Sequence, residues 1–459
     1  MIIETVIVRG GTQMWVGLHA RQRSIGCLLA ILIAGVLGGI QPSEAQAEVT
    51  AFVGAKIIDG TGKAPIEHGI LIIRDGRILA VGAAGELTAP EGTQLIDVTG
   101  KTIMPGLING HGHIGGTVGL EGGRYSRENV ERDLQLNARY GVTTVVSLGG
   151  DQAASIAIRD AEDTTALNRA RLRVAGPVVV GEEPEEAMIM VDANVQLGAD
   201  FIKIKVDGAA GSPQRMSQDV FTAVISYSQA RGVPVASHLY YLDDARELVA
   251  AGLDYIAHSI RDQVVDDAFV AQAREAGVYY CPTLMRDVST FIYESEPEFF
   301  ADPLFLTEIG PEVLDQLRDP ARQARIRSNA RAQANKEALR VALINLKKLA
   351  DAGVPIVMGT DGGPPGRFQG YFEHLEMEMM VEQAGLSPMQ VIVAATGGAA
   401  GSLGLSEVGT LEAGKWADFI VLTADPLEAI AHTRSLESVW IAGNQVPRNH
   451  PETNVSSQR

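Results

Sequence analysis

The stretch IMPGLINGHGH, residues 103–113, does most to decide the fold of this chain. Its apolar part, from Ile103 to Ile108, predicts a buried β-strand that runs on to His111 and His113. Side chains of residues i and i+2 in a strand point to the same face. The two imidazoles are therefore expected to face one point, which is how a protein holds a metal ion from one side.

Eight short apolar runs follow one another along the chain, and amphipathic stretches such as 217–231 and 243–251 separate them as predicted helices. The runs are residues 107–111, 143–147, 173–179, 201–206, 233–236, 255–257, 278–280 and 356–358. Strands that alternate with helices predict parallel βα units. Eight units over about 300 residues indicate an α/β fold with a closed (β/α)8 TIM barrel. A doubly wound open sheet is the alternative, although no glycine-rich phosphate motif follows the first run.

Both ends of the chain are rich in short strand-like runs, including two runs that flank the turn Asp75-Gly76. An Asp-Gly pair between two such runs is a strong hairpin signal. We therefore predict a small β-sandwich domain built from residues 48–104 and 406–447, around a metal-dependent barrel at 105–405. A long aromatic-rich loop at 283–330 is predicted as an insertion, either a lid over the site or packing remote from it.

Composition and charge limit the partners of this chain. Hydrophobic residues make up 46% and charged residues 20%, as in a globular protein with a large core. The formal net charge of −18 and an aromatic content of 5% argue against nucleic acid as a partner. We expect a small-molecule substrate and a homo-oligomer.

The N-terminus predicts export, with a signal peptide at residues 1–47. Arg21 and Arg23 precede an apolar run over 25–40, and Ala-Gln-Ala at 45–47 fits a cleavage site. This run is shorter than the roughly 20 residues that span a membrane. We therefore expect a periplasmic or secreted protein with no membrane span after cleavage; an uncleaved anchor is the alternative. Cys281 is then the single cysteine, interpreted as a small buried residue rather than a nucleophile.

Further candidate metal ligands fall at the ends of separate predicted strands: Lys203, Lys205, His238, His258 and Asp361. In barrels, catalytic groups lie at the carboxyl ends of the strands. Lys203 and Lys205 share a face by alternation, and burying an unpaired ammonium is costly. Such a lysine needs a carboxylate partner or conversion by carbon dioxide to a carbamate, which turns a cation into an oxygen ligand.

Two more residues are candidates for binding the substrate. Tyr240 follows His238 by two residues, so alternation points it toward the same site. It is interpreted as a hydrogen-bond donor to an oxyanion or a substrate carboxylate, with a packing tyrosine as the alternative. Arg286 follows the seventh strand and is a candidate clamp for a substrate carboxylate, which guanidinium binds in a bidentate manner.

These motifs together resemble the amidohydrolase superfamily, within it the exported branch similar to Xaa-Pro dipeptidases and imidazolonepropionase-related hydrolases. The resemblance covers nearly all of the chain after residue 47. The matching stretches are residues 104–113, 198–203, 236–238, 256–258, 359–361 and 408–418. Asn109 stands where the family usually has Asp, which is a minor departure.

The resemblance implies a role for each candidate ligand. His111, His113 and Asp361 would bind the more buried metal. Lys203, as a carbamate, would bridge to a second metal, with Lys205 as the competing residue for the bridge. The second metal would be completed by the two remaining imidazoles, those of His238 and His258.

The resemblance also implies two zinc ions, with other divalent metals as alternatives, because nitrogen and oxygen ligands suit zinc. Two cations bring a shared water to hydroxide near neutral pH, and Asp361 would carry its proton to the leaving nitrogen. We therefore predict a hydrolase that cleaves the amide C–N bond of a dipeptide, an Xaa-Pro peptide or an N-acyl amino acid.

Two other functions stay open. The first is a mononuclear cyclic amidohydrolase or deaminase of the imidazolonepropionase type, in which Lys203 stays unmodified and His111, His113, His238 and Asp361 hold one metal. The second is a non-catalytic metal-binding protein. Asp361 argues against the latter, because a closed structural zinc site needs no spare carboxylate.

Overall fold

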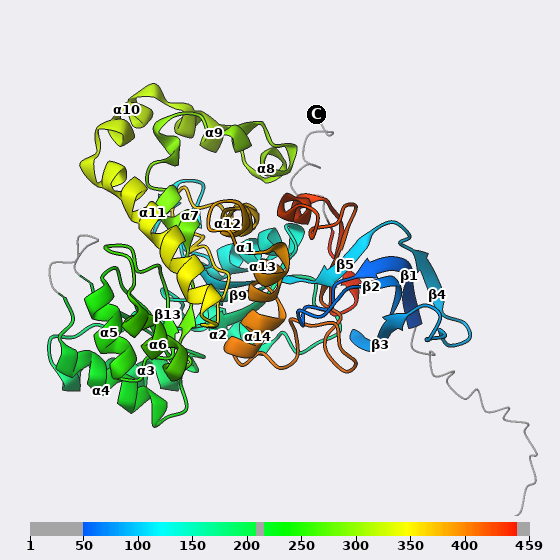
Figure 1. Ribbon diagram of the computed structural model, residues 1–459, viewed down its shortest axis with the longest axis horizontal. Coiled ribbons are helices and arrows are strands. Elements are labelled where there is room, and N and C mark those ends of the chain that lie inside the picture. Colours follow the sequence, from blue (N-terminus) through cyan, green and yellow to red (C-terminus); the bar gives the residue numbers. More distant parts are fainter. Residues whose placement is uncertain (1–48, 208–214, 448–459) are drawn as a thin grey trace, which may run out of the picture. The chain divides into compact units, whose positions relative to one another are not determined.

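The computed structural model describes residues 49–207 and 215–447 (Figure 1). The predicted signal peptide at 1–47 lies outside these residues. Among the described helices, none combines the length and the apolar character that crossing a membrane requires.

An eight-stranded mixed sheet takes strands from both ends of the described chain. Its order is β17-β16-β15-β5-β1-β2-β3, with β4 beside β1. The strands are β1 (Val49–Ile57), β2 (Ile66–Arg74), β3 (Arg77–Ala83), β4 (Gln94–Asp97), β5 (Thr102–Pro105), β15 (Phe419–Leu422), β16 (Leu436–Ile441) and β17 (Asn444–Gln445). Figure 1 shows β1 to β5 on the right, with the C-terminal strands in red beside them.

Local chemistry explains this sheet. Asp75 and Gly76 both have positive φ, 52° and 76°, as a tight two-residue hairpin turn between β2 and β3 requires. Phe52 from β1 packs edge-on against Phe419 from β15, with 5.0 Å between the ring centroids. The two ends of the chain thus meet through hydrophobic contacts as well as through the β5–β15 pairing.

Seven buried strands form two parallel sheets. The first contains β6 (Leu107–Gly112), β9 (Val142–Ser147) and β10 (Arg171–Val174), and the second contains β11 (Ile202–Lys205), β12 (Val235–His238), β13 (Tyr255–Ile256) and β14 (Tyr279–Tyr280). Single parallel bridges continue this pairing, between Val179 and Ile204, Tyr280 and Ile356, and Gly112 and Gly362.

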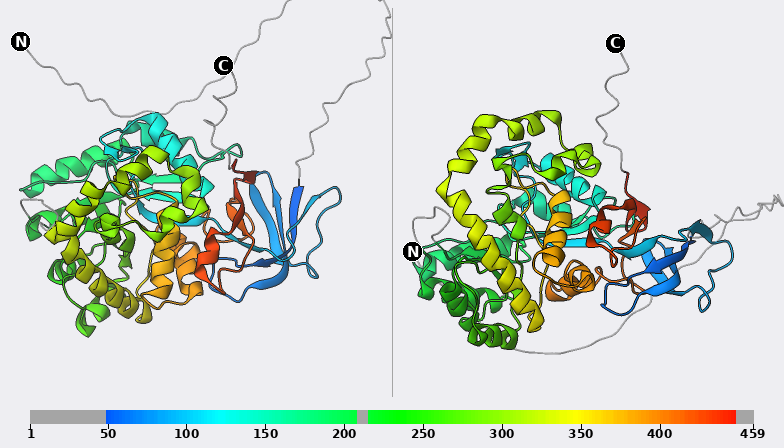
Figure 2. Two further views of the ribbon diagram at one scale, coloured as in Figure 1. Left: turned by 90° about the horizontal axis from the view of Figure 1, so that it is seen from above. Right: turned by 45° about the horizontal axis from the view of Figure 1, so that its top comes forward.

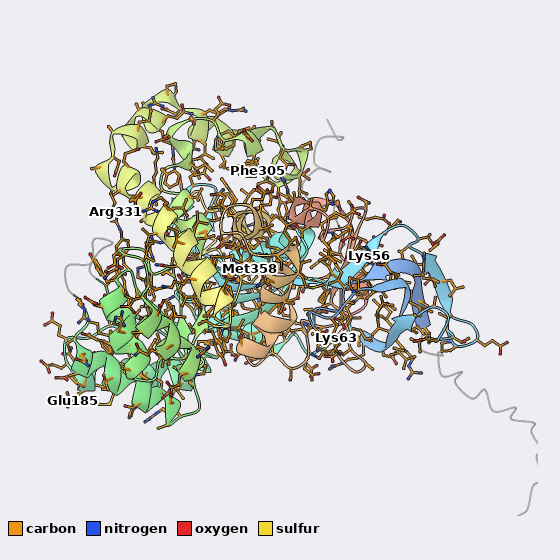
Figure 3. All side chains as sticks on the ribbon, viewed as in Figure 1. Lys56, Lys63, Glu185, Phe305, Arg331 and Met358 are labelled. Carbon is orange, nitrogen blue, oxygen red and sulfur yellow. The ribbon has the colours of Figure 1, made fainter. Side chains whose placement is uncertain are left out.

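Two of the predicted strands differ most from the structure. The run at 173–179 gives β10 only as far as Val174, because Gly176 takes a left-handed φ of 69° and Pro177 has no N–H to donate. The run at 356–358 forms a single bridge at Ile356. Met358, labelled in the interior in Figure 3, donates its N–H to the carbonyl of Ala394 instead of to a strand.

Helices follow the parallel strands and cover them, as the views in Figure 2 show. They are α1 (Arg127–Arg139), α2 (Ala153–Asp160), α3 (Pro184–Leu197), α4 (Gln218–Gln229), α5 (Leu242–Ala250), α6 (Asp267–Ala276), α11 (Ala330–Asp351), α12 (Tyr371–Glu382), α13 (Pro388–Ala394) and α14 (Gly397–Ser402). The predicted helices at 217–231 and 243–251 correspond to α4 and α5. Ser217 and Asp266 cap α4 and α6 through their side-chain oxygens.

The predicted loop at 283–330 consists mostly of short helices: α7 (Leu284–Val288), η1 (Ile292–Glu294), η2 (Glu298–Ala301), α8 (Pro303–Glu308), α9 (Pro311–Arg318) and α10 (Pro320–Ser328). Proline opens α8, α9 and α10, and this N1 preference was a missed sequence signal. Phe305, labelled in Figure 3, packs 4.9 Å from Phe299 and 5.0 Å from Tyr371 between ring centroids. The aromatic side chains of the insertion therefore form the hydrophobic core against which α8 and α12 pack.

Candidate metal centre and active site

Three of the predicted ligands converge on one point. His111, His113 and Asp361 each offer one ligand atom, and these atoms lie within 4.8 Å of one another. Nε2 of His113 lies 2.8 Å from Oδ1 of Asp361, and Nε2 of His111 lies 3.6 Å from the same oxygen. Among the described residues, this is the group of histidine, cysteine and acidic side chains with the spacing of a metal site.

Backbone hydrogen bonds from residues 111 and 113, at and just after the end of β6, to residues 361–362 hold these ligands together. The N–H of Asp361 donates to the carbonyl of His111 at 2.7 Å, and the N–H of His113 donates to that of Gly362 at 2.8 Å. Asp361 has a φ of 55°, a left-handed conformation that is unfavourable for a residue with a side chain. Such strain persists where the surroundings impose it, as at catalytic sites.

The donor set fits a divalent metal. Nδ1 of His113 lies 3.0 Å from the carbonyl oxygen of Gly149, which only accepts, so Nδ1 donates there and Nε2 is the ring nitrogen directed at Asp361. Nε2 of His113 and Oδ1 of Asp361 then lie 2.8 Å apart and are directed at the same place, so one cation can bind both. Two imidazole nitrogens and a carboxylate oxygen are ligands that zinc accepts.

Two arginines bind the other side of Asp361. Oδ2 accepts a hydrogen bond from Nη1 of Arg367 and lies 3.8 Å from Nε of Arg286. Burial opposes ionisation, but Arg367 and the imidazoles of His113 and His111 outweigh it and hold the pKa of Asp361 well below its usual range. Asp361 is therefore a carboxylate at neutral pH.

Lys203 lies beside the first imidazole. Its side chain is buried, and Nζ lies 3.4 Å from Nε2 of His111. Burial lowers the pKa of Lys203 to about 8, which increases the neutral amine that reacts with carbon dioxide. Lys205 is half-buried at the end of β11, in register with His238. Of the two predicted lysines, Lys203 is the one in contact with His111.

His238 and His258 lie next to this group. Their ring centroids are 4.2 Å apart, and the ring of His258 lies 4.7 Å from that of His111. Nδ1 of His258 pairs with Oγ1 of Thr283 at 2.7 Å, which leaves its Nε2 for the site. Nε2 of His238 instead lies 3.1 Å from Oδ2 of Asp207.

Burial keeps both of these imidazoles neutral, which is the form that binds a metal. It lowers the pKa of His238 to about 4, against the opposing effect of Asp207, and lowers that of His258 well below its usual range. The sequence analysis missed Asp207. The spacing 203, 205, 207 was a signal, because alternation through β11 and the two residues that follow it would place these side chains on one side.

Tyr240 and Arg286 both contact a buried pair of charged residues, Arg261 and Asp287. The guanidinium of the fully buried Arg261 lies 4.7 Å from the ring centroid of Tyr240. Nε of Arg261 lies 3.1 Å from Oδ2 of Asp287, and Arg286 donates to Oδ1 of the same carboxylate at 2.6 Å. Arg261, Asp287 and Arg367 were missed, because no sequence pattern predicts which buried charges pair across a fold.

Cys281 is fully buried, as predicted for a small packing residue. Burial raises the pKa of its thiol to about 12, so the nucleophilic thiolate is suppressed.

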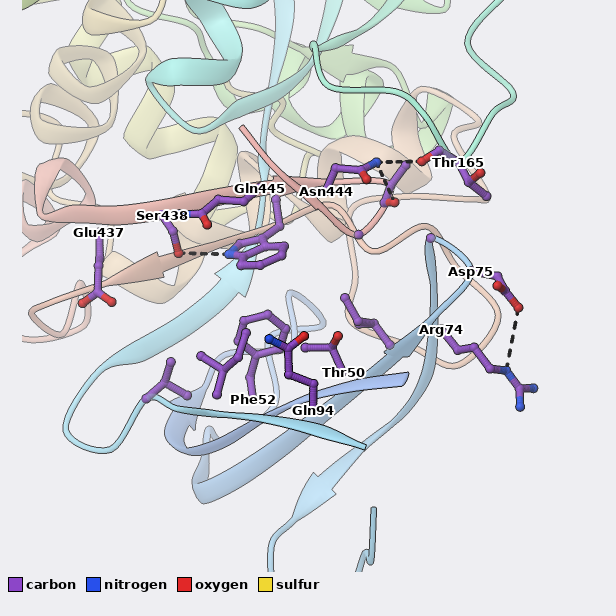
Figure 4. Close-up of a pocket in the computed structure, with 17 residues that line it drawn as sticks. Thr50, Phe52, Arg74, Asp75, Gln94, Thr165, Glu437, Ser438, Asn444 and Gln445 are labelled. Atoms are coloured by element: carbon purple, nitrogen blue, oxygen red, sulfur yellow. Dashed lines mark hydrogen bonds and ion pairs between the residues drawn. The ribbon is translucent and has the colours of Figure 1, made fainter. Parts of the chain in front are cut away.

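A separate cavity of 850 Å³ lies on the mixed sheet (Figure 4). Phe52 and Trp440 contribute to its lining, and Trp440 donates from Nε1 to Oγ of Ser438 at 2.9 Å. None of the predicted site residues lines this cavity, so it is not part of the candidate active site.

A model of the amidohydrolase family matches residues 102–446, which include every candidate ligand. The chain belongs to the amidohydrolase family. It is therefore an enzyme that acts on carbon–nitrogen bonds, as the sequence predicted, and members of this family generally bind divalent metals.

Known proteins of the family share most of its length. An imidazolonepropionase of Deinococcus deserti is 25% identical over 409 residues, 83% of this chain and 92% of that protein. The crystal structure of a putative prolidase from Bifidobacterium longum has a TM-score of 0.70 at 27% identity, covering 87% of this chain and 95% of that one. A Xaa-Pro dipeptidase solved with bound methionine has a TM-score of 0.69 at 22% identity, covering 87% and 99%, and shows likeness of fold.

Proposed function

We propose that this amidohydrolase cleaves the amide or peptide C–N bond of a small substrate that carries a carboxylate: a dipeptide, an Xaa-Pro peptide or an N-acyl amino acid. The observation that carries the proposal is the convergence of His111, His113 and Asp361 directly beside the guanidinium of Arg286. A metal centre next to a fixed cation suits a substrate in which a scissile carbonyl lies near a carboxylate.

The proposed architecture places the site at the carboxyl ends of the strands of a (β/α)8 barrel. Parallel pairing from β6 to β10 and from β11 to β14, with single bridges linking the two sheets and returning to β6, supports it. The mixed sheet of the chain ends is proposed to be the β-sandwich domain. Export and a homo-oligomer stay predictions.

The residues proposed to hold the metals are those the sequence predicted. His111, His113 and Asp361 would hold one ion; His238 and His258 would hold a second, with Lys203 as the bridging carbamate. Zinc is proposed because of the nitrogen and oxygen donors. The chemistry that bound metal supplies is polarisation of the scissile carbonyl and a lowered pKa for water.

The chain's own residues have distinct roles in this proposal. Asp361 accepts the proton of the attacking water and delivers it to the leaving nitrogen, so it acts as base and then acid. Arg367 keeps Asp361 ionised before the proton arrives. Arg286 binds the substrate carboxylate, and the hydroxyl of Tyr240 donates to the oxyanion or to that carboxylate.

A second candidate is the mononuclear cyclic amidohydrolase or deaminase. One observation favours a single ion: among the described residues, only His111, His113 and Asp361 form a metal-spaced group. The fourth ligand predicted for this candidate, His238, directs its Nε2 at Asp207. The imidazolonepropionase of Deinococcus deserti, similar over 83% of this chain, belongs to that class by name. One bound metal per chain would support this candidate.

The test is amine release by the zinc-loaded protein on a panel of dipeptides, N-acyl amino acids and cyclic amides. We expect turnover of Xaa-Pro or N-acyl substrates and its loss in Asp361→Asn. Zinc content and melting temperature of the variant show whether it is folded and loaded. Turnover of cyclic amides alone would overturn the proposed substrate class and favour the mononuclear enzyme.

A further inference from the structure

A fully buried polar cluster lies behind the three converging ligands. It consists of Asn109 from β6, Thr360 from the segment that ends in Asp361, and Glu373 from α12. Each of these three residues is at most 1% exposed. Nδ2 of Asn109 donates to Oε1 of Glu373, and Oγ1 of Thr360 donates to the same oxygen at 3.0 Å. We call these three residues the Glu373 cluster.

The Glu373 cluster holds the backbone on both sides of the ligands. Oδ1 of Asn109 accepts the N–H of His111 at 2.9 Å and that of Thr360 at 3.3 Å. Oγ1 of Thr360 accepts the N–H of Gly362 at 3.0 Å. The residues before and after Asp361 are therefore both fixed by side chains of this cluster.

This fixation coincides with backbone strain. Asp361 has a φ of 55° between the two residues that the cluster holds. Aspartate adopts this conformation more readily than most residues, but it is still uncommon, and local hydrogen bonds help to hold it. The cluster supplies hydrogen bonds that relaxation of Asp361 would break.

The hydrogen bonds inside the Glu373 cluster have a definite direction: Asn109 and Thr360 donate, and Glu373 accepts. Glu373 lies in the first turn of α12. Burial raises the pKa of its carboxyl group to about 7, and the backbone N–H groups of Gly370 and Glu373 oppose this rise, as do Thr360 and Asn109. Oε1 of Glu373 accepts hydrogen bonds from the amide of Asn109 and the hydroxyl of Thr360, whereas the buried Oε2 makes none. The backbone N–H groups of Gly370 and Glu373 are the donors that its own helix offers. An amide at position 373 would set its NH₂ against donors on one side or the other.

We infer that Glu373 is a positioning residue for the metal centre: through Asn109 and Thr360 it fixes the backbone of His111 and Asp361 and so sets the metal affinity of the site. The inference rests on the metal centre in the proposed function. It assigns Glu373 no contact with the substrate or with the reacting atoms. Residues that orient metal ligands typically affect metal affinity by about 10- to 100-fold when replaced.

The test is a reciprocal exchange. Glu373→Gln sets an amide against donors, and Asn109→Asp sets a carboxylate against the carboxylate of Glu373. The double variant Asn109→Asp/Glu373→Gln restores a donor–acceptor pair, because the new amide at position 373 donates to the new carboxylate at position 109 and presents its oxygen to the N–H groups of α12. The hydroxyl of Thr360, which lies 3.1 Å from Nδ2 of Asn109, then donates to that new carboxylate.

The readout is zinc affinity by competition with a chelator, with the visible spectrum of the cobalt-loaded protein as a report on ligand geometry. We expect each single variant to bind zinc about 10- to 100-fold more weakly. The double variant is expected to recover most of the affinity and the cobalt spectrum. Native affinity in both single variants, or a double variant weaker than either, would overturn the inference.

Glu376→Gln is the matched control. Glu376 lies one turn further along α12 and is equally buried, but it accepts the N–H groups of Leu284 and Met285 at 2.7 Å. Loss of stability without loss of zinc affinity is expected there. A similar loss of zinc affinity in Glu376→Gln would reduce Glu373 to a general packing role. Zinc binding without amide cleavage would refute the proposed function alone, and a wild-type protein that binds no zinc would refute both.

Discussion

Arg286 and Arg367 approach the same oxygen of Asp361 from two different segments. Nε of Arg286 lies 3.8 Å from Oδ2, and Nη1 of Arg367 donates to it. Arg367 is six residues from Asp361 in the chain, whereas Arg286 reaches it from α7. Arg286 also pairs with Asp287, so its guanidinium is held in place before any substrate binds.

Replacing Arg286 should weaken carboxylate substrates selectively. We expect Arg286→Gln to raise KM for an N-acyl amino acid by about 10- to 100-fold, since a charge-assisted hydrogen bond contributes roughly 1.5–3 kcal/mol. Steady-state kinetics on the acid and on its carboxamide give the comparison. Equal losses on the two substrates would contradict a role for Arg286 in binding the carboxylate.

Replacing Lys203 should change the number of metals. If its carbamate bridges two ions, Lys203→Ala should lower the zinc content from about two per chain to about one or none, and its activity should fall with it. Elemental analysis of the dialysed proteins measures this. Lys205→Ala is the matched control and should keep the wild-type content. The prediction fails if the wild-type protein holds a single zinc and Lys203→Ala keeps it.

Removing the hydroxyl of Tyr240 separates its two interpretations. Tyr240→Phe keeps the ring over the guanidinium of Arg261, so the melting temperature should stay unchanged. A hydroxyl that donates to an oxyanion should lower kcat by about 10²-fold or more when it is lost. An unchanged kcat would leave Tyr240 as a packing residue.

His374 should make stability fall on acidification. Burial lowers its pKa from 6.5 to about 4, and Nδ1 and Nε2 pair with Thr433 and the carbonyl of Tyr140. The unfolded chain therefore binds a proton that the folded chain does not between these values. The contribution of neutral His374 to the free energy of unfolding is therefore complete above pH 6.5. It is lost as the pH falls toward 4, by up to about 3 kcal/mol.

Urea unfolding at pH 7 and pH 4.5 measures this slope. His374→Gln keeps an amide donor and acceptor without the titration, so its stability should depend less on pH than that of the wild-type protein. Parallel slopes for the two proteins would show that other groups account for the acid sensitivity.

Much of the fold follows from local pattern. The apolar run that leads to His111 and His113 forms β6. The apolar runs that lead to Lys203 and His238 form β11 and β12. The insertion at 283–330 was harder, because its helices are short and depend on Tyr371 and its neighbours in α12 for their core. A segment whose stability comes from distant packing carries little periodicity of its own.

The sequence by itself determined the family, the strand positions and the residue types that converge, because period-two alternation and strand ends are local properties. Only the tertiary structure decided the partners. It placed Arg367 and Arg286 on Asp361, Asp207 on His238, and Glu373 on Asn109. These pairings depend on which buried groups need a hydrogen bond once the elements pack, and no local pattern encodes that requirement.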